Sequence, residues 1–176
     1  MSPPLNVVGK AHEAKRSGDF VWFVYGSSLD AEAFGAWAAQ HGYRVPDLSR
    51  GRPSRLRGFR LAFDALSRSW GGAVASLLEA PGDTVEGLAL PVPGDARGLV
   101  DHKEGAVSGL YAPFDVSLEP LGGGAPVAAV AYRTAEERRL RAEGAPSPGY
   151  LAALIRGARA SGLSPQWVAR LESLGR

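Results

Sequence analysis

Glu104 is the residue of this chain whose type and setting best suit proton transfer. It stands in Asp101-His102-Lys103-Glu104-Gly105, directly after the expected end of a short helix over residues 93–101. A carboxyl group at such a junction can be held in a pocket, where burial raises its pKa. An exposed loop glutamate is the plain alternative, since glutamate is among the residues least often buried. Glu104 is therefore a candidate acid/base.

A turn rich in small residues supplies a second candidate, a site for an anion. Residues 20–25 form an apolar run typical of a strand buried on both faces, and residues 30–40 have helical periodicity. Between them stand Gly26, Ser27, Ser28 and Leu29. A strand that leads through such a turn into a helix presents backbone N–H groups to an anion. A helix cap without a ligand fits equally well, so both interpretations stay open.

Other catalytic chemistries find less support. Ser27 and Ser28 lack the G-x-S-x-G pattern of α/β-hydrolases, and three histidines are the only candidate bases for a Ser/His triad. His102-Lys103-Glu104 matches the H-x-E of zinc deaminases, but the chain has no cysteine to complete that site. P-loop and dinucleotide-binding motifs are absent. Tyr111 and Tyr150 follow turns and could place hydroxyls in a cleft, although each also fits a half-buried core position.

The overall composition is that of an ordinary globular protein. The 176 residues are 45% apolar and 22% charged, and a net charge of +2 is too small to favour a polyanionic partner. No apolar run reaches the length of a membrane span, and the N-terminus has no secretory signal pattern. Arg50-Gly51-Arg52-Pro53 matches the core of an AT-hook, but loop arginines are the simpler interpretation. We expect a cytoplasmic protein with no nucleic-acid or membrane partner.

Turn residues divide the remaining chain into strands and then helices. A tight turn at residues 81–83 predicts a hairpin between residues 73–78 and 85–90. Ser147-Pro148 and Ser164-Pro165 each place a capping residue before a proline, which predicts two helix starts. About six strands with flanking helices indicate an α+β fold with a curved sheet or small barrel. We expect a loose arm over residues 1–19 and one domain over residues 20–176.

Four stretches together resemble the γ-glutamylcyclotransferase family, which includes plant relatives of the avirulence-induced-gene type. The family motif Y-G-S-N-L corresponds to residues 25–29, and D-x-x-E-G-V-x-S-G-x-Y corresponds to residues 101–111. Residues 70–87 are similar to the central hairpin of the family, and residues 145–163 to its animal members. The resemblance covers Phe20 to about Leu174. Ser28 departs from the family pattern, since it stands where the motif has asparagine.

The resemblance implies a small mixed β-barrel with flanking helices and a site at the barrel mouth that needs no cofactor and no metal. It implies release of 5-oxoproline from a γ-glutamyl amino acid, peptide or amine, with Glu104 as the acid/base. A small-molecule-binding protein of the same fold without turnover is the alternative. The leaving group and the oligomeric state, a homodimer included, stay open. The substrate-binding residues implied by the resemblance are Tyr25, Gly26, Ser27, Ser28, Leu29, Tyr111 and Tyr150.

Overall fold

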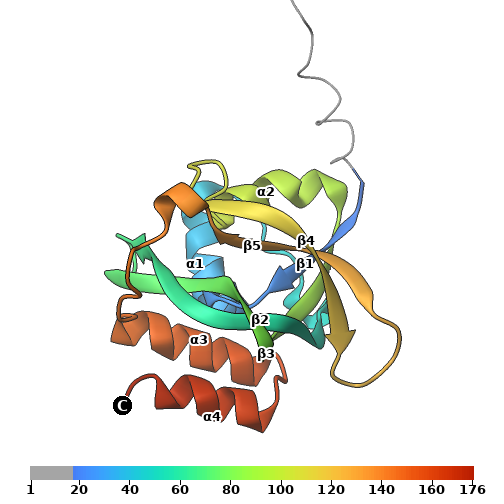
Figure 1. Ribbon diagram of the computed structural model, residues 1–176. Helices are drawn as coiled ribbons and strands as arrows, with labels where there is room; N and C mark the ends of the chain where they lie inside the picture. Colours follow the sequence, from blue (N-terminus) through green and yellow to red (C-terminus); the bar gives the residue numbers. More distant parts are fainter. Residues whose placement is uncertain (1–17) are drawn as a thin grey trace, which may run out of the picture.

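Five strands close into a small barrel in the order β1, β3, β2, β4, β5. The computed structural model describes residues 18–176, so the arm predicted over residues 1–19 lies almost wholly outside the described residues. Figure 1 shows the barrel with helices around it, which confirms the predicted α+β barrel. Residues 18–176 contain five strands, one fewer than the approximately six that were expected. The strands are β1 (Phe20–Val24), β2 (Arg52–Ser67), β3 (Gly72–Val92), β4 (Tyr111–Pro120) and β5 (Val127–Thr134).

Strand β1 closes the barrel, and it is the strand that leads into the Gly/Ser turn. It runs antiparallel to β3 and is joined to β5 through a parallel pair, Trp22 with Val130. The side chains of Trp22, Phe23 and Val24 are all buried. The prediction of a strand buried on both faces is confirmed, because successive side chains of β1 point to opposite faces of the sheet and are equally buried.

The hairpin predicted within residues 73–90 is wrong. Strand β3 continues through residues 81–83 and pairs with β2 along most of its length, and the chain reverses instead between β2 and β3, at residues 68–71. The register shifts where Arg57 pairs with Thr84 and Phe59 pairs with Glu79. Residues 80–83 thus bulge out of the ladder opposite Gly58. A bulge and a tight turn use the same residue types, and here pairing with β2 decided between them.

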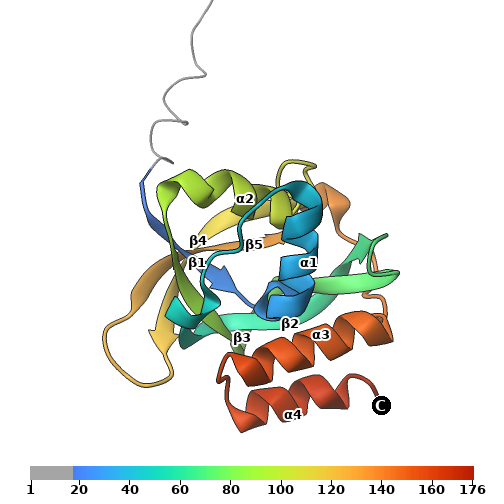
Figure 2. The same ribbon diagram turned by 180° about the vertical axis from the view of Figure 1, so that it is seen from behind.

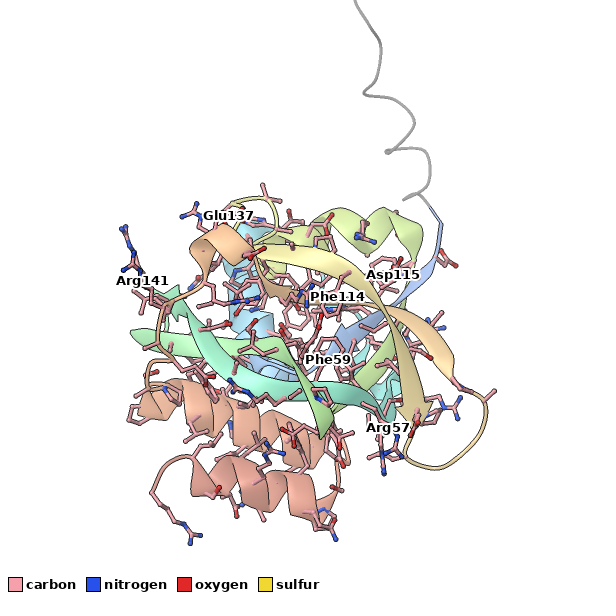
Figure 3. The ribbon with its side chains drawn as sticks, in the orientation of Figure 1. Arg57, Phe59, Phe114, Asp115, Glu137 and Arg141 are labelled. Atoms are coloured by element: carbon pink, nitrogen blue, oxygen red, sulfur yellow. The ribbon has the colours of Figure 1, made fainter. Side chains whose placement is uncertain are left out.

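Strands β2 and β4 pair over a short stretch and then diverge. Their pairs are Ser54 with Pro120 and Arg55 with Glu119. Beyond that point Phe59 and Phe114 lie between the two strands, with ring centroids 5.7 Å apart (Figure 3). The guanidinium of Arg133 lies 4.5 Å from the Phe114 ring centroid and covers it. Aromatic packing therefore takes the place of backbone hydrogen bonds on this side of the barrel.

The helices surround the barrel on three sides. Helices α3 and α4 lie side by side below it, α2 lies above it, and α1 covers the face seen in Figure 2. Both predicted Ser-Pro helix starts are confirmed: the side chain of Ser147 caps α3 and that of Ser164 caps α4. Helix α2 runs two residues beyond the predicted end at Asp101. The helices are α1 (Ala31–His41), α2 (Arg97–Lys103), α3 (Pro148–Ala160) and α4 (Pro165–Ser173).

Candidate active site

A cavity of about 450 Å³ opens at one end of the barrel. The turn between β2 and β3, the loop after α2 and the start of α3 gather at this end, on the left of Figure 1, with α1 beside them. The cavity is therefore lined by residues that lie far apart in the chain. The predicted site residues that line the cavity are Tyr25, Gly26, Ser27, Ser28, Glu104, Tyr111 and Tyr150.

Glu104 is held by the way helix α2 ends. It is the C-terminal capping residue of α2, and Gly105 follows with a φ of 70°. The Gly105 N–H donates to the His102 carbonyl (3.0 Å), and the Ala106 N–H donates to the Asp101 carbonyl (2.8 Å). This pair of bonds is the Schellman motif, in which glycine takes the left-handed position at little steric cost. The backbone of Glu104 is therefore fixed, and its side chain is aimed at the cavity.

Burial raises the pKa of Glu104 to about 7. The carboxyl group retains access to the cavity but is otherwise surrounded by protein, which disfavours its charged form. Two neighbours oppose the shift, the Lys103 ammonium and the indole N–H of Trp22. Among the described residues, the buried Trp22 N–H has no acceptor at full hydrogen-bonding geometry, so Glu104 is its candidate acceptor. The result is a carboxyl group that can both take and give a proton near neutral pH.

The Gly/Ser turn forms a single 3₁₀ turn, Ser27–Leu29, that leads into α1. The Leu29 N–H donates to the Gly26 carbonyl (3.1 Å), and the Asp30 N–H donates to the Ser27 carbonyl (3.0 Å). After these two bonds, the backbone donors left in the turn are the N–H groups of Gly26, Ser27 and Ser28. The Ser27 N–H also faces the Tyr150 hydroxyl, where it lowers the pKa of that group. Such donors at the approach to a helix N-terminus suit a carboxylate.

Helix α3 supports this turn from below through close backbone contact. At Gly157, a Cβ atom in ideal geometry would lie 2.6 Å from both the Asp30 nitrogen and the Leu29 carbonyl carbon. Next to it, the Arg156 guanidinium pairs with the buried Asp30 carboxylate at 2.7 Å. Leu29 does not line the cavity; its side chain is buried at this contact with α3. Leu29 is thus a packing residue of the turn in this structure.

Three buried tyrosine hydroxyls are tied to the backbone around the cavity. Tyr111 donates to the Ala75 carbonyl (2.7 Å), and the Ala75 N–H donates to the Tyr150 hydroxyl (3.0 Å). Tyr25 donates to the Tyr132 carbonyl (2.5 Å). Burial raises the pKa of Tyr25, Tyr111 and Tyr150 above the usual value, and the nearby Glu104 adds to the effect. All three remain neutral hydroxyl groups at physiological pH.

Known proteins match this chain both in sequence and in fold. The model of the AIG2-like family matches residues 84–171, which is half of the chain. The chain belongs to the AIG2-like family. This confirms the resemblance to γ-glutamylcyclotransferase-like proteins, and further matches agree with it.

The AIG2-like chain is similar in sequence to mammalian γ-glutamylcyclotransferases. It is 28% identical to the Bos taurus protein over 159 residues, covering 88% of this chain and 78% of that protein. It is 26% identical to the Homo sapiens protein, with the same two coverages.

Two solved structures share the fold. A γ-glutamyl cyclotransferase has a TM-score of 0.73 at 23% identity, with 88% of this chain and 87% of that chain covered. YkqA from Bacillus subtilis has a TM-score of 0.73 at 26% identity, covering 92% of this chain and 55% of that chain. The AIG2-like barrel therefore corresponds to about half of the YkqA chain.

Several cavity residues of the AIG2-like protein were not predicted as site residues. Trp37 lies in the helix predicted over residues 30–40, and it lines the cavity together with Gln40. Lys103 lines it from the end of α2, and Trp70 packs against the Tyr150 ring at a centroid distance of 5.3 Å. Helical periodicity places a side chain on a face but does not say whether that face meets core or cavity, so Trp37 and Gln40 carried no distinguishing signal.

The structure also bears on the alternatives that found less support in the sequence. His41 and His102 pack with Trp37 and do not line the cavity, so neither is placed to activate Ser27 or Ser28, while His12 lies outside the described residues. No three histidine or carboxylate side chains among residues 18–176 converge as metal ligands would. No helix in this part of the chain is long and apolar enough to cross a membrane. In the AT-hook match, Arg52 and Pro53 begin β2.

Replacing Tyr150 with phenylalanine should lower the free energy of unfolding by about 1–3 kcal/mol, because the buried Ala75 N–H loses its acceptor. Urea unfolding followed by circular dichroism measures this loss. Tyr43→Phe is the matched control, since the Tyr43 hydroxyl bonds to His102 at the surface. Equal stability of the two variants would show that Tyr150 does not satisfy the Ala75 N–H.

Proposed function

We propose that this protein is a γ-glutamyl cyclotransferase that releases 5-oxoproline and a free amine or amino acid. The observation that carries the proposal is the placement of Glu104, with a pKa of about 7, in the same cavity as the Gly26–Ser28 turn. One group suits a proton transfer and the other suits a carboxylate. The similarity to proteins named γ-glutamylcyclotransferase supports the same reaction.

The proposed reaction begins with the substrate fixed at both ends of its glutamyl group. The N–H groups of the turn hold the α-carboxylate, and the α-ammonium lies next to Glu104. The Glu104 carboxylate accepts a proton from the ammonium, and the free amine attacks the γ-carbonyl of the same molecule. A C–N bond forms, the carbonyl oxygen becomes an oxyanion, and the turn steadies this charge.

The second half of the proposed reaction returns the proton. The oxyanion collapses, the bond from the γ-carbon to the leaving nitrogen breaks, and protonated Glu104 gives its proton to that nitrogen. The ring nitrogen still carries a second proton after the attack. The regenerated Glu104 carboxylate takes this proton and passes it to the released amine, so the products are 5-oxoproline, a protonated amine and Glu104 carboxylate. A carboxyl group whose pKa lies near 7 can act in both directions, whereas one with an ordinary pKa would be a weak acid catalyst at neutral pH.

The tyrosines would shape the part of the cavity that holds the glutamyl chain. Tyr111 and Tyr150 are fixed through Ala75 on β3, and Tyr25 is fixed through β5. Because the nucleophile and the carbonyl belong to one molecule, holding the chain in a folded conformation supplies much of the rate. Rigid neutral rings suit this role, since they exclude water without introducing charge.

Measurement of 5-oxoproline release tests the proposal. Purified protein is incubated with γ-glutamyl-alanine, γ-glutamyl-ethylamide and glutathione, and 5-oxoproline is quantified by chromatography. We expect release from at least one of them. Failure of folded protein to release 5-oxoproline from all three, combined with tight 5-oxoproline binding in calorimetry, would instead favour a binding protein that lacks turnover.

Two substitutions at Ser27 separate its backbone from its side chain. Ser27→Ala should change kcat/KM by less than about threefold, because the turn acts through N–H groups, whose loss alone costs about 10²–10³ in oxyanion sites. Ser27→Pro removes that N–H at the first position of a helical turn, where proline is tolerated and where Gly26 is already extended. We expect Ser27→Pro to lower kcat/KM by at least about tenfold. Collapse of activity in Ser27→Ala with an intact fold would instead show that the hydroxyl is required.

A further inference from the structure

Lys103 places a positive charge on the wall of the cavity. Lys103 and Glu104 are its only charged lining residues in the described part of the chain. The Lys103 Nζ atom lies 5.3 Å from the Trp37 ring centroid and 5.7 Å from that of Phe34, both on α1. Lys103 takes part in none of the ion pairs among residues 18–176. The ammonium group thus lies against two aromatic rings without a carboxylate in an ion pair with it among these residues.

The surroundings of Lys103 favour the arrival of an anion. Burial lowers the pKa of Lys103, and Glu104 is the neighbour that opposes this shift. Because the pKa of Glu104 is about 7, that group carries its negative charge only part of the time at neutral pH. The rings of Phe34 and Trp37 offset a fraction of the lost hydration. A carboxylate that entered the cavity would form an ion pair with the Lys103 ammonium.

The position of Lys103 argues against the α-carboxylate of the glutamyl group as that anion. The proposed α-carboxylate site is the turn at the start of α1, and Trp37 follows Ala31 by six residues, or roughly 9 Å along the helix axis. The Lys103 ammonium meets α1 at Phe34 and Trp37, three and six residues after Ala31, and thus along the helix from the turn. A γ-glutamyl amino acid carries a second carboxylate on its leaving group, at the end opposite the first.

We propose that Lys103 is a specificity-determining residue. It selects γ-glutamyl compounds whose leaving group carries a carboxylate over those whose leaving group is an amine without one. This inference rests on the proposed cyclotransferase function. Lysine offers a mobile point charge, whereas arginine would impose a planar bidentate geometry. A mobile charge accepts carboxylates in several positions, so the selection concerns the charge of the leaving group and not one particular amino acid.

A matched pair of substrates tests the inference. γ-Glutamyl-alanine and γ-glutamyl-ethylamide share the glutamyl group, the scissile amide and the methyl-bearing carbon, and they differ by the leaving-group carboxylate. We expect wild-type kcat/KM to favour γ-glutamyl-alanine by about 10–100-fold, the range of a charge-assisted hydrogen bond. In Lys103→Met the ratio should fall to within about threefold, while Lys103→Arg should keep most of it. Lys103→Gln provides a second neutral variant should the methionine variant fold poorly.

Binding separates failure of this inference from failure of the proposed reaction. Calorimetric titration of both compounds into Glu104→Gln, with and without Lys103→Met, needs no turnover. A preference for γ-glutamyl-alanine that disappears with Lys103→Met supports the inference even if wild type releases no 5-oxoproline. Turnover of both compounds with equal kcat/KM, or a ratio that Lys103→Met leaves unchanged, would overturn the inference and leave the cyclotransferase reaction standing. Equal losses for both compounds in Lys103→Met would place the α-carboxylate, instead of the leaving group, at Lys103.

Discussion

Replacing Glu104 with glutamine should lower the rate of 5-oxoproline release by about 10²–10⁴-fold, the usual contribution of a positioned acid/base. Glutamine keeps the shape of the side chain and removes its ability to exchange a proton. The end of α2 and the Schellman motif do not depend on the carboxyl group, so the fold should be retained. Steady-state kinetics with γ-glutamyl-alanine measures the rate, and circular dichroism of the same sample measures whether the fold is retained.

A second carboxylate provides the control for this substitution. Glu119 pairs with Arg57 on the outside of the barrel, and Glu119→Gln should leave both the rate and the fold within experimental error of wild type. Glu104→Gln should also bind 5-oxoproline about as well as wild type, since product binding needs no proton transfer. Near-normal turnover by Glu104→Gln would remove Glu104 from the acid/base role.

The pKa of Glu104 also sets the pH dependence of the reaction. The first step needs the carboxylate form, so kcat/KM should fall as the pH drops below about 7, with a single ionisation on the acid side.

The effect of Glu104 on folding stability depends on pH in the opposite direction. A folded-state pKa above the unfolded value stabilises the fold at low pH, and this contribution is lost as the pH rises from about 4.5 to 7, at most about 3 kcal/mol. Glu104→Gln should therefore gain thermal stability relative to wild type at pH 8 but not at pH 4.

Replacing Gly157 with alanine should lower the free energy of unfolding by about 1–3 kcal/mol, the usual cost of overpacking. Glycine to alanine inside a helix normally stabilises, but here the new Cβ would lie 2.6 Å from backbone atoms of Leu29 and Asp30. Helix α3 would have to move away from the turn that is proposed to hold the substrate carboxylate. Since displacements of about 1 Å can cost about 10²-fold in rate, kcat/KM should fall strongly too.

Gly149 in the same helix provides the matched control. Nothing lies within 4 Å of the position that a Cβ at Gly149 would occupy, so Gly149→Ala should be neutral or stabilising by up to about 1 kcal/mol. Chemical unfolding and kcat/KM are measured on both variants. If Gly157→Ala matched Gly149→Ala in stability and rate, the close contact between α3 and the turn would not control the site.

Local patterns predicted most of the elements because their causes are local. The apolar run of β1 and the two Ser-Pro helix starts require no knowledge of the rest of the fold. The hairpin at residues 81–83 failed for the opposite reason. Proline, glycine and aspartate there permit either a reversal or a bulge, and the partner strand β2, which precedes them in the chain, determines the outcome.

The residues of the candidate site also divide into those that local sequence identifies and those that only contacts between elements reveal. Glu104, the Gly/Ser turn and the tyrosines could be identified because the family motifs contain them. Trp22, Lys103 and Gly157 could not, since their importance comes from contacts between elements. Trp22 looks like any strand residue until its N–H is found next to a carboxyl group. Gly157 looks like a weak point of α3 until the turn is found against it.

The parallel pairing of β1 with β5 has a consequence for how the protein is made. Trp22 must find Val130 to close the barrel, and the turn at residues 26–28 must then meet Gly157. Contacts this distant in sequence slow folding, because the entropy of closing long loops is lost before the contacts between their ends form. While a ribosome is still synthesising the chain, Glu104 and the turn emerge well before the segments that enclose them. The cavity therefore becomes complete only when translation has passed α3, so a chain cut short before that helix would carry the catalytic motifs without a working site.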